Sequence, residues 1–467
     1  MSPLVSPSTS EVTEHLHFEV RRPSSPLSIS STVLHGEPKR SGSFEVVEID
    51  PELLETLKQT DLFNEKAGAV DEEAPPSEFP IQTLPEGGWK AWLTVIGAYI
   101  NSFGIYDDYY VRVYLKNYTP SDIGWIGGIQ IFLTFSCGAF SGRLFDKGYL
   151  YVFFSKYLFS LSLTHENAYY QVFLSHGVTL GLASGLSYVP TFGIAGHYFS
   201  RKRPFVVGLI SSGSALGSVL NPLMLNKLFN GPMGFHNGVR ISAAINTFLM
   251  LVALLIMRTN LPPKQAQPYR IRSWLKEPAY LCLLLGVILV FFGLFYPVFT
   301  IQLYAMKHGV SPSLAFYSTS ILNASSFFGR VIPGLFTGLL GTLNLGAFMT
   351  ISSGVIVLCM ASVTNATGTI LFSIFFGFFQ GGAISLTPAI VAHLAKDPTE
   401  IGTRMGVVFA LGGFVGLFAM PISGVLLTEH YNWVSPMIFA GVTIIASGLF
   451  YGLARFFYGQ GKPSLWL

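Results

Sequence analysis

Charged residues are scarce in this 467-residue chain, at 11% of all positions, whereas about 25% is usual in soluble proteins. Half of the residues are hydrophobic, and the mean hydropathy is +0.50. So few charged side chains do not cover the surface of a soluble protein of this length. The composition therefore argues against a soluble enzyme.

Cysteine is equally scarce, because Cys137, Cys282 and Cys359 are the only three and all lie in apolar runs. Three cysteines do not make a disulfide framework. No cluster of Cys, His and Asp indicates a metal site, and no glycine-rich phosphate loop indicates direct use of ATP. No basic patch with interleaved aromatics indicates nucleic acid. We therefore expect no metal, no cofactor and no nucleic-acid partner.

The charges that are present divide the chain into an acidic tail and a basic body. Residues 1–90 hold 7 basic and 16 acidic residues, and the rest holds 21 basic and 9 acidic ones. Residues 1–84 are rich in Ser, Pro and Glu, which predicts a disordered cytosolic tail, and they contain no apolar run of signal-peptide length. The tail is either regulatory, with phosphorylation sites, or an unstructured leader without a specific role.

Apolar segments repeat from Trp89 onward, and a bilayer core of about 30 Å needs about 20 apolar residues per helix. Two segments are short, 91–106 and 148–164; each can span with local thinning of the bilayer or with help from flanking residues, and twelve helices require that both do. The others begin near Ile123, Tyr170, Phe205, Val239, Ala279, Ser313, Leu345, Thr369, Thr403 and Trp433. We predict an all-α membrane protein with twelve transmembrane helices. Its parts are a six-helix bundle over 85–257, a linker over 258–277, a second bundle over 278–458 and a tail over 459–467.

The basic residues of the predicted loops set the orientation, because cytosolic loops carry an excess of Lys and Arg. With the tail in the cytosol, the external loops carry five: Arg112, Lys116, Lys227, Arg240 and Lys307. The cytosolic loops carry twelve: Arg143, Lys147, Arg201, Lys202, Arg203, Arg258, Lys264, Arg270, Arg272, Lys276, Lys396 and Arg404. We expect cytosolic termini and a plasma-membrane location. The Asn117-Tyr118-Thr119 triplet is then a candidate external glycosylation site, weakened by Pro120.

The two halves resemble each other in helices five and eleven. Each helix has two glycines and a proline at spacings of four and five residues: Gly213, Gly217 and Pro222, then Gly412, Gly416 and Pro421. Small residues let helices approach closely, and proline permits a bend. A six-helix repeat is typical of a two-bundle transporter with its site near the midplane. The alternative is that Gly and Pro are common in membrane helices.

Arg330 is the foremost candidate for a substrate or coupling residue. It lies near the middle of predicted helix eight, flanked by Phe327, Phe328, Val331 and Ile332. A cation at that depth is costly, so it is expected to face a polar cavity, where a guanidinium holds a carboxylate through two hydrogen bonds. The alternative is an arginine bonded to backbone carbonyls between the bundles.

Further polar candidates for the cavity are Tyr188, Tyr296, Asn323 and Gln380, each of which is otherwise a packing or helix-bonding residue. His176 is a candidate because histidine titrates near neutral pH. Its alternative role is a packing histidine with its hydrogen bonds satisfied.

Three motifs carry a family resemblance. Residues Glu86–Trp92 (EGGWKAW) resemble the first signature of the monocarboxylate porter family, within the major facilitator superfamily. Residues Tyr198–Arg203 (YFSRKR), followed by Gly208 and Gly213, resemble its second signature, and Gly142–Gly148 resembles the superfamily's loop between helices two and three. The patterns Asn101–Gly104 and Ser121–Ile123 are similar to the fungal branch.

The resemblance implies the major-facilitator fold and gradient-driven transport of a small, anionic organic acid or related metabolite, with protons as a candidate partner. It places a substrate-linked arginine at Arg330. Animal members have an aspartate at the position of Ser326 and a helix-one lysine where Asn101 stands, so Asn101 and Ser326 become candidate site residues. Arg143, Asp146 and Lys147, together with Arg203, are candidate gating residues; the alternative is a topogenic charge cluster.

We therefore predict a secondary active transporter for a small organic acid, working by alternating access in the lipid bilayer, and not an enzyme. An efflux pump for a secondary metabolite is the first alternative. A non-transporting nutrient sensor on the same fold is the alternative of another class.

Overall fold

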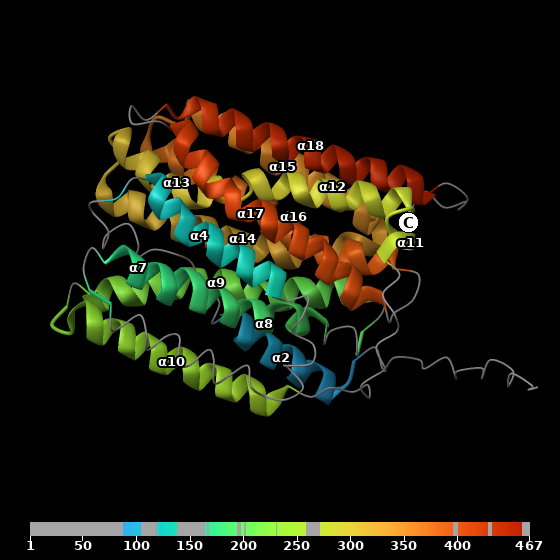
Figure 1. Ribbon diagram of the computed structural model, residues 1–467, viewed down its shortest axis with the longest axis horizontal. Coiled ribbons are helices and arrows are strands. Elements are labelled where there is room, and N and C mark those ends of the chain that lie inside the picture. The colour runs from blue at the N-terminus through green and yellow to red at the C-terminus, as the bar shows by residue number, and fades with distance from the viewer. Residues whose placement is uncertain are drawn as a thin grey trace, which may run out of the picture. The chain divides into compact units, whose positions relative to one another are not determined.

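The computed structural model describes residues 87–103, 118, 120–137, 164–165, 168–193, 198–199, 202–229, 231–257, 271–395, 400–427 and 432–459. Every regular element within these ranges is helical (Figure 1). The predicted tail over 1–84, the third predicted segment apart from Thr164, and the C-terminal residues after Gly459 lie outside the described part of the chain.

The N-terminal set of helices runs from α2 to α10. Its members are α2 (Trp89–Phe103), α4 (Pro120–Ser136), α7 (Tyr169–Val172), the π-helical η3 (Phe173–Leu180), α8 (Gly181–Gly193), α9 (Arg203–Phe229) and α10 (Gly234–Ile256). The fourth predicted segment thus continues through three consecutive helical pieces. The described part of the first predicted segment is α2, and residues 104–106 of that segment lie outside the described residues.

The C-terminal set runs from α12 to α18. It comprises α12 (Pro278–Gly293), α13 (Tyr296–Lys307), α14 (Pro312–Leu340), α15 (Thr342–Cys359), η5 (Met360–Ser362), α16 (Ala366–Leu394), α17 (Ile401–Leu427) and α18 (Val434–Gly459). A short helix, α11 (Ile271–Trp274), precedes it within the predicted linker. The ten predicted starting points differ from the observed helix starts by one to five residues.

Local sequence explains where several of these helices begin and break. The Ser311 hydroxyl accepts a hydrogen bond from the Leu314 amide at 3.4 Å, with Pro312 in the first turn. The Asn365 side chain caps α16 through the Gly368 amide at 2.7 Å. Both are N-caps that satisfy amides left open by the first turn. The seventh segment breaks between α12 and α13 because Pro297 lacks an amide hydrogen for the Gly293 carbonyl.

Length and composition allow six helical segments of the described chain to cross a membrane. They are Arg203–Phe229, Pro278–Lys307, Thr342–Ser362, Ala366–Leu394, Ile401–Leu427 and Val434–Gly459. Many of their large apolar side chains are exposed, including Leu371, Val425 and Leu449. These surfaces suit lipid rather than water.

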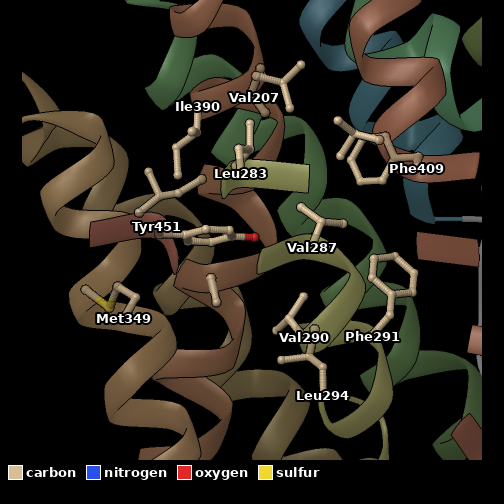
Figure 2. Close-up of a cluster of buried hydrophobic side chains, with 14 of the residues drawn as sticks. Val207, Leu283, Val287, Val290, Phe291, Leu294, Met349, Ile390, Phe409 and Tyr451 are labelled. Carbon is tan, nitrogen blue, oxygen red and sulfur yellow. The ribbon is translucent and has the colours of Figure 1, made fainter. Parts of the chain in front are cut away.

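Two pairs of helices make the most extensive contacts between the N-terminal set and the C-terminal set. Helix α4 packs along α17, and α9 packs along α14 (Figure 1). Within the C-terminal set, α12 and α15 both pack against α18, and α14 packs against α16. Buried hydrophobic side chains continue across the boundary, as Val207 of α9 belongs to the same cluster as Leu283 of α12 and Ile390 of α16 (Figure 2).

Candidate functional site

A cavity of about 150 Å³ lies between the two sets of helices. Its wall includes α4, α8 and α9 from the N-terminal set and every long helix of the C-terminal set. The polar lining consists of amides and hydroxyls: Gln130, Thr134, Tyr188, Ser211, Ser214, Ser218, Asn323, Thr350, Gln380, Thr387 and Tyr451. Among the described lining residues Arg330 is the only charged one.

Arg330 projects from α14 and is 9% exposed. Its Nε atom donates to the hydroxyl of Ser326, one turn earlier, at 3.3 Å. Its Nη1 atom donates to the carbonyl oxygen of Ser211 at 2.7 Å and also to the hydroxyl of Ser214. Both acceptors on α9 belong to the other set of helices. The guanidinium therefore lines the cavity and bridges the boundary.

A close approach of the two backbones brings the guanidinium to α9. A Cβ atom added at Gly208 would collide with the carbonyl oxygen of Arg330. Near the end of α14, a Cβ atom at Gly334 would lie 2.8 Å from the Phe205 Cα atom. The absence of a side chain at these two positions lets α9 and α14 touch, as small residues do in other membrane-helix contacts.

Aromatic rings form the apolar part of the cavity wall. Phe135 of α4 stacks on Phe409 of α17, with ring centroids 5.5 Å apart, and meets Phe291 of α12 edge-on at 4.9 Å. Tyr188 of α8 contacts both Phe135 at 5.0 Å and Phe409 at 5.6 Å. These four rings, with Phe192 against Tyr188 at 4.8 Å, form an aromatic cluster that joins both sets of helices.

The structure brings four predicted site residues together at the cavity: Arg330, Asn323, Tyr188 and Gln380. Ser326 is buried and reaches the cavity through its bond with Arg330. Tyr296 and His176 are also buried but do not belong to the described lining; His176 lies in the π-helical segment η3. Asn101 lies in α2.

The remaining predicted residues fall into two groups. Arg143, Asp146, Lys147 and Asn117 lie outside the described residues. Arg203 begins α9 and donates from Nε to the Phe199 carbonyl oxygen at 3.2 Å. Of the predicted packing residues, Gly412 lies against the Phe291 ring and Gly416 against Ile131 of α4, while Pro222 and Pro421 lie inside their helices.

The three serines that line the α9 side of the cavity were not predicted from the sequence. Ser211, Ser214 and Ser218 follow each other at spacings of three and four residues, which places them on one face of a helix. That spacing is readable in the sequence. What the sequence does not provide is the partner, because Arg330 lies 116 to 119 positions away.

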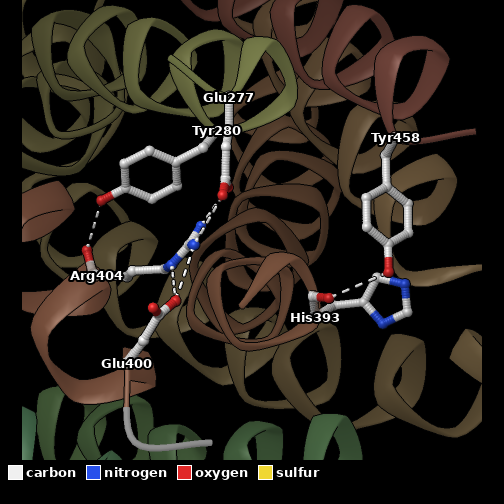
Figure 3. A network of polar contacts seen from close by, with 6 residues as sticks. All are labelled: Glu277, Tyr280, His393, Glu400, Arg404 and Tyr458. Carbon is white, nitrogen blue, oxygen red and sulfur yellow. Dashed lines mark hydrogen bonds and ion pairs between the residues drawn. The ribbon is translucent and has the colours of Figure 1, made fainter. Parts of the chain in front are cut away.

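A second polar cluster lies at the start of α17 (Figure 3). Arg404, 1% exposed, pairs with Glu277 at 2.7 Å and with Glu400 at 2.9 Å. Its guanidinium carbon lies 5.1 Å from the ring centroids of both Trp274 and Tyr280. Arg404 was counted among the cytosolic loop charges, but it lies in the first turn of α17. It is buried because two carboxylates and two rings replace its water.

Long apolar helices around a shared polar cavity define a multi-pass membrane transporter with its site between two helix bundles. The chain belongs to the Major Facilitator Superfamily, whose family model matches residues 88–370. It has that superfamily's fold of two six-helix bundles, and it is a transporter rather than an enzyme.

Three fungal relatives show what this chain resembles. It is 36% identical to the "Aspyridones efflux protein apdF" of Emericella nidulans, over 83% of this chain and 82% of the relative. It is 34% identical to the "Agnestins efflux protein AgnL12" of Paecilomyces divaricatus, over 78% and 87%. It is 32% identical to the "MFS transporter asaE" of Aspergillus flavus, over 82% and 91%. None of these three names mentions a monocarboxylate, so the family is supported at the level of the superfamily.

Proposed function

We propose that this protein exports a weakly acidic, aromatic secondary metabolite. Two relatives that cover most of the chain are named as efflux proteins, for aspyridones and for agnestins. This favours the efflux alternative over the uptake of a small monocarboxylate. The substrate of this chain need not be either compound, because the relatives differ from it at almost two thirds of the aligned positions.

The chemistry of the cavity supports the substrate class. A buried guanidinium attracts a carboxylate or an ionised enol, and it holds a planar anion through parallel hydrogen bonds. The aromatic cluster around Phe135 and Phe409 offers faces and edges to a ring. Arg330 beside this cluster is the observation that carries the proposal. Amide groups of Asn323 and Gln380 supply further hydrogen bonds for keto or hydroxyl groups.

Transport would follow alternating access, in which the two bundles rock about the cavity. The contacts of α4 with α17 and of α9 with α14 are the surfaces that rocking rearranges. The loop charges support cytosolic termini, and export of a metabolite from the cell requires the plasma membrane. Arg143, Asp146 and Lys147 remain candidate gating residues on the predicted cytosolic turn.

Proton coupling would need a carrier other than the cavity residues of the described chain. Their ionisable members are Arg330 and the phenols of Tyr188 and Tyr451, none of which exchanges protons readily near neutral pH. Ser326 occupies the position where animal monocarboxylate porters have an aspartate, and a hydroxyl does not replace a carboxylate as a proton carrier. We therefore propose that export follows the substrate gradient, or that a residue away from the cavity couples protons.

A comparison of a deletion strain with its parent tests the direction and the cargo. The proposal predicts that an acidic aromatic metabolite accumulates in the deletant's cells and falls in the medium, as measured by mass spectrometry. Re-expression of the chain should restore its export, and the Arg330→Met variant should not. Loss of uptake of a small organic acid would instead identify an importer, and a growth defect without altered flux would favour a sensor.

A further inference from the structure

The bonds of Arg330 with α9 exist only while α9 and α14 touch. Nη1 reaches the Ser211 carbonyl oxygen at 2.7 Å, and the Arg330 backbone lies against Gly208 of the same helix. The Arg330 side chain is anchored on α14, so its bonds with α9 break when the two helices separate. We infer that the Arg330 guanidinium alternates between two partners: Ser211 and Ser214 on α9, and the anionic group of the substrate. We call its bonds with Ser211 and Ser214 the clasp. The inference rests on the proposed function.

The number of N–H donors on the guanidinium explains why the two partners exclude each other. Nη1 carries two hydrogens, and it donates one to the Ser211 carbonyl and one to the Ser214 hydroxyl. A carboxylate that binds end-on takes one hydrogen from each terminal nitrogen. It therefore displaces at least one of the two bonds with α9. Substrate and α9 compete for the same edge of Arg330.

The position of these bonds, near the cytosolic ends of α9 and α14, determines the direction of transport. Ser211 and Ser214 lie in the first half of α9, which begins at Arg203, and Arg330 lies nearer the end of α14 than its start. Loop charges assign these two ends to the cytosolic face. When they separate, α9 releases Arg330 and the site binds the anion tightly. When they close, α9 retakes Arg330 and the anion is released toward the other face, which is the direction of export.

Ser214 is the residue through which the clasp can be altered, because the Ser211 acceptor is a backbone atom. The Ser214→Ala variant removes one of the two α9 bonds, and Ser214→Asp adds a carboxylate that holds Arg330 on α9. Ser212 offers a matched control: it is a buried serine of α9 whose hydroxyl donates to the Leu209 carbonyl oxygen at 2.7 Å, and it is outside the described lining of the cavity.

Spin labels at the touching ends of α9 and α14 measure the clasp without substrate. Lys202 is exposed, and a side chain at Gly338 meets no neighbour, so Lys202→Cys and Gly338→Cys carry the labels once Cys137, Cys282 and Cys359 are replaced. Electron-electron resonance distances in the purified full chain should show more of the separated state in Ser214→Ala, by about tenfold in the ratio of the two populations. Ser214→Asp should remove the separated state, and Ser212→Ala should match the parent.

Binding of 2-naphthoate, an aromatic carboxylate, completes the test. It should enlarge the separated population of the parent and bind about tenfold more tightly to Ser214→Ala, whereas 2-naphthylmethanol should do neither. If naphthoate binds through Arg330 and the Ser214 variants show the same distances as Ser212→Ala, the clasp is wrong and the anion site stands. If the Ser214 variants shift the distances but no naphthoate binds, the clasp stands and the proposed anionic substrate is wrong.

Discussion

The Nη1 atom of Arg330 lies 2.7 Å from the carbonyl oxygen of Ser211, and this bond links α14 to α9 across the boundary between the two bundles. The same guanidinium lines the central cavity. In the proposed function, one charged group takes part in both substrate contact and bundle contact, so binding and conformational change are linked by geometry. By this linkage, any ligand that binds Arg330 better in one arrangement shifts the protein toward that arrangement.

Replacing Arg330 should show whether the protein recognises the negative charge of its substrate. Arg330→Met should reduce transport of an aromatic acid by about tenfold to a hundredfold, because one or two charge-assisted hydrogen bonds are lost, and should spare its neutral methyl ester. Arg330→Lys should recover only part of the loss, since an ammonium does not form two parallel bonds with a carboxylate. Initial rates in vesicles measure both variants, with Lys202→Met as the control for a cation elsewhere. Equal losses for acid and ester would contradict a role in anion binding.

A side chain at Gly208 should block the contact of α9 with α14. The Cβ atom of Gly208→Val would collide with the Arg330 carbonyl, so we expect at least a tenfold loss of transport while the protein still reaches the membrane. Gly338→Val, on an open part of α14, should transport normally. Transport assays normalised to surface expression compare the two. Normal transport by Gly208→Val would show that the close contact is not needed.

The aromatic cluster should determine the preference for ring-containing substrates. Phe409→Ala removes a ring that contacts both Phe135 and Tyr188, and such contacts contribute about 0.5–1.5 kcal/mol each beyond buried area. We expect about tenfold weaker binding of an aromatic acid and little change for a small aliphatic one. Phe418→Ala, on the same helix but outside the described cavity lining, is the matched control. Equal effects on both acids would assign Phe409 to packing alone.

The Arg404 cluster should stabilise the C-terminal bundle. Arg404→Met leaves Glu277 and Glu400 without their shared partner, and loss of one member of a buried ion pair costs about 3–5 kcal/mol. Since the two carboxylates keep some contact with water, we expect the lower end of that range. Thermal unfolding of the detergent-purified protein should start several degrees lower, whereas the exposed Lys276→Met should have no effect. An unchanged unfolding temperature would mean that the cluster adds no net stability.

The described fold was largely predictable from the sequence because a membrane helix is encoded locally. Apolar length and flanking turns set the start of each helix, so the ten predicted starts lie within five residues of the observed ones. The break before α13 was not foreseen, although Pro297 is its visible cause. Proline inside α9 and α17 leaves those helices continuous, and the sequence does not distinguish these outcomes.

The site was less predictable because its contacts join distant positions. The depth of Arg330 in its segment predicted either a polar cavity or a bond with a backbone carbonyl between the bundles, and the structure shows both features. Its partners on α9 depend on the packing of two helices that are more than 100 residues apart. Arg404 shows the same limit: Glu400 is one turn away, but Glu277 is 127 positions away. Counting Lys and Arg near the predicted helix ends does not distinguish a buried cation such as Arg404 from a loop residue.

The most direct test of the account is the transport of matched compounds by purified protein in inside-out vesicles, in which the cytosolic face is outside. We predict that vesicles with the parent protein take up an aromatic carboxylate rapidly and its methyl ester slowly, and that Arg330→Met loses this preference. Equal initial uptake rates of acid and ester by the parent, or an unchanged preference in Arg330→Met, would contradict the claim that Arg330 selects an anionic aromatic substrate for export.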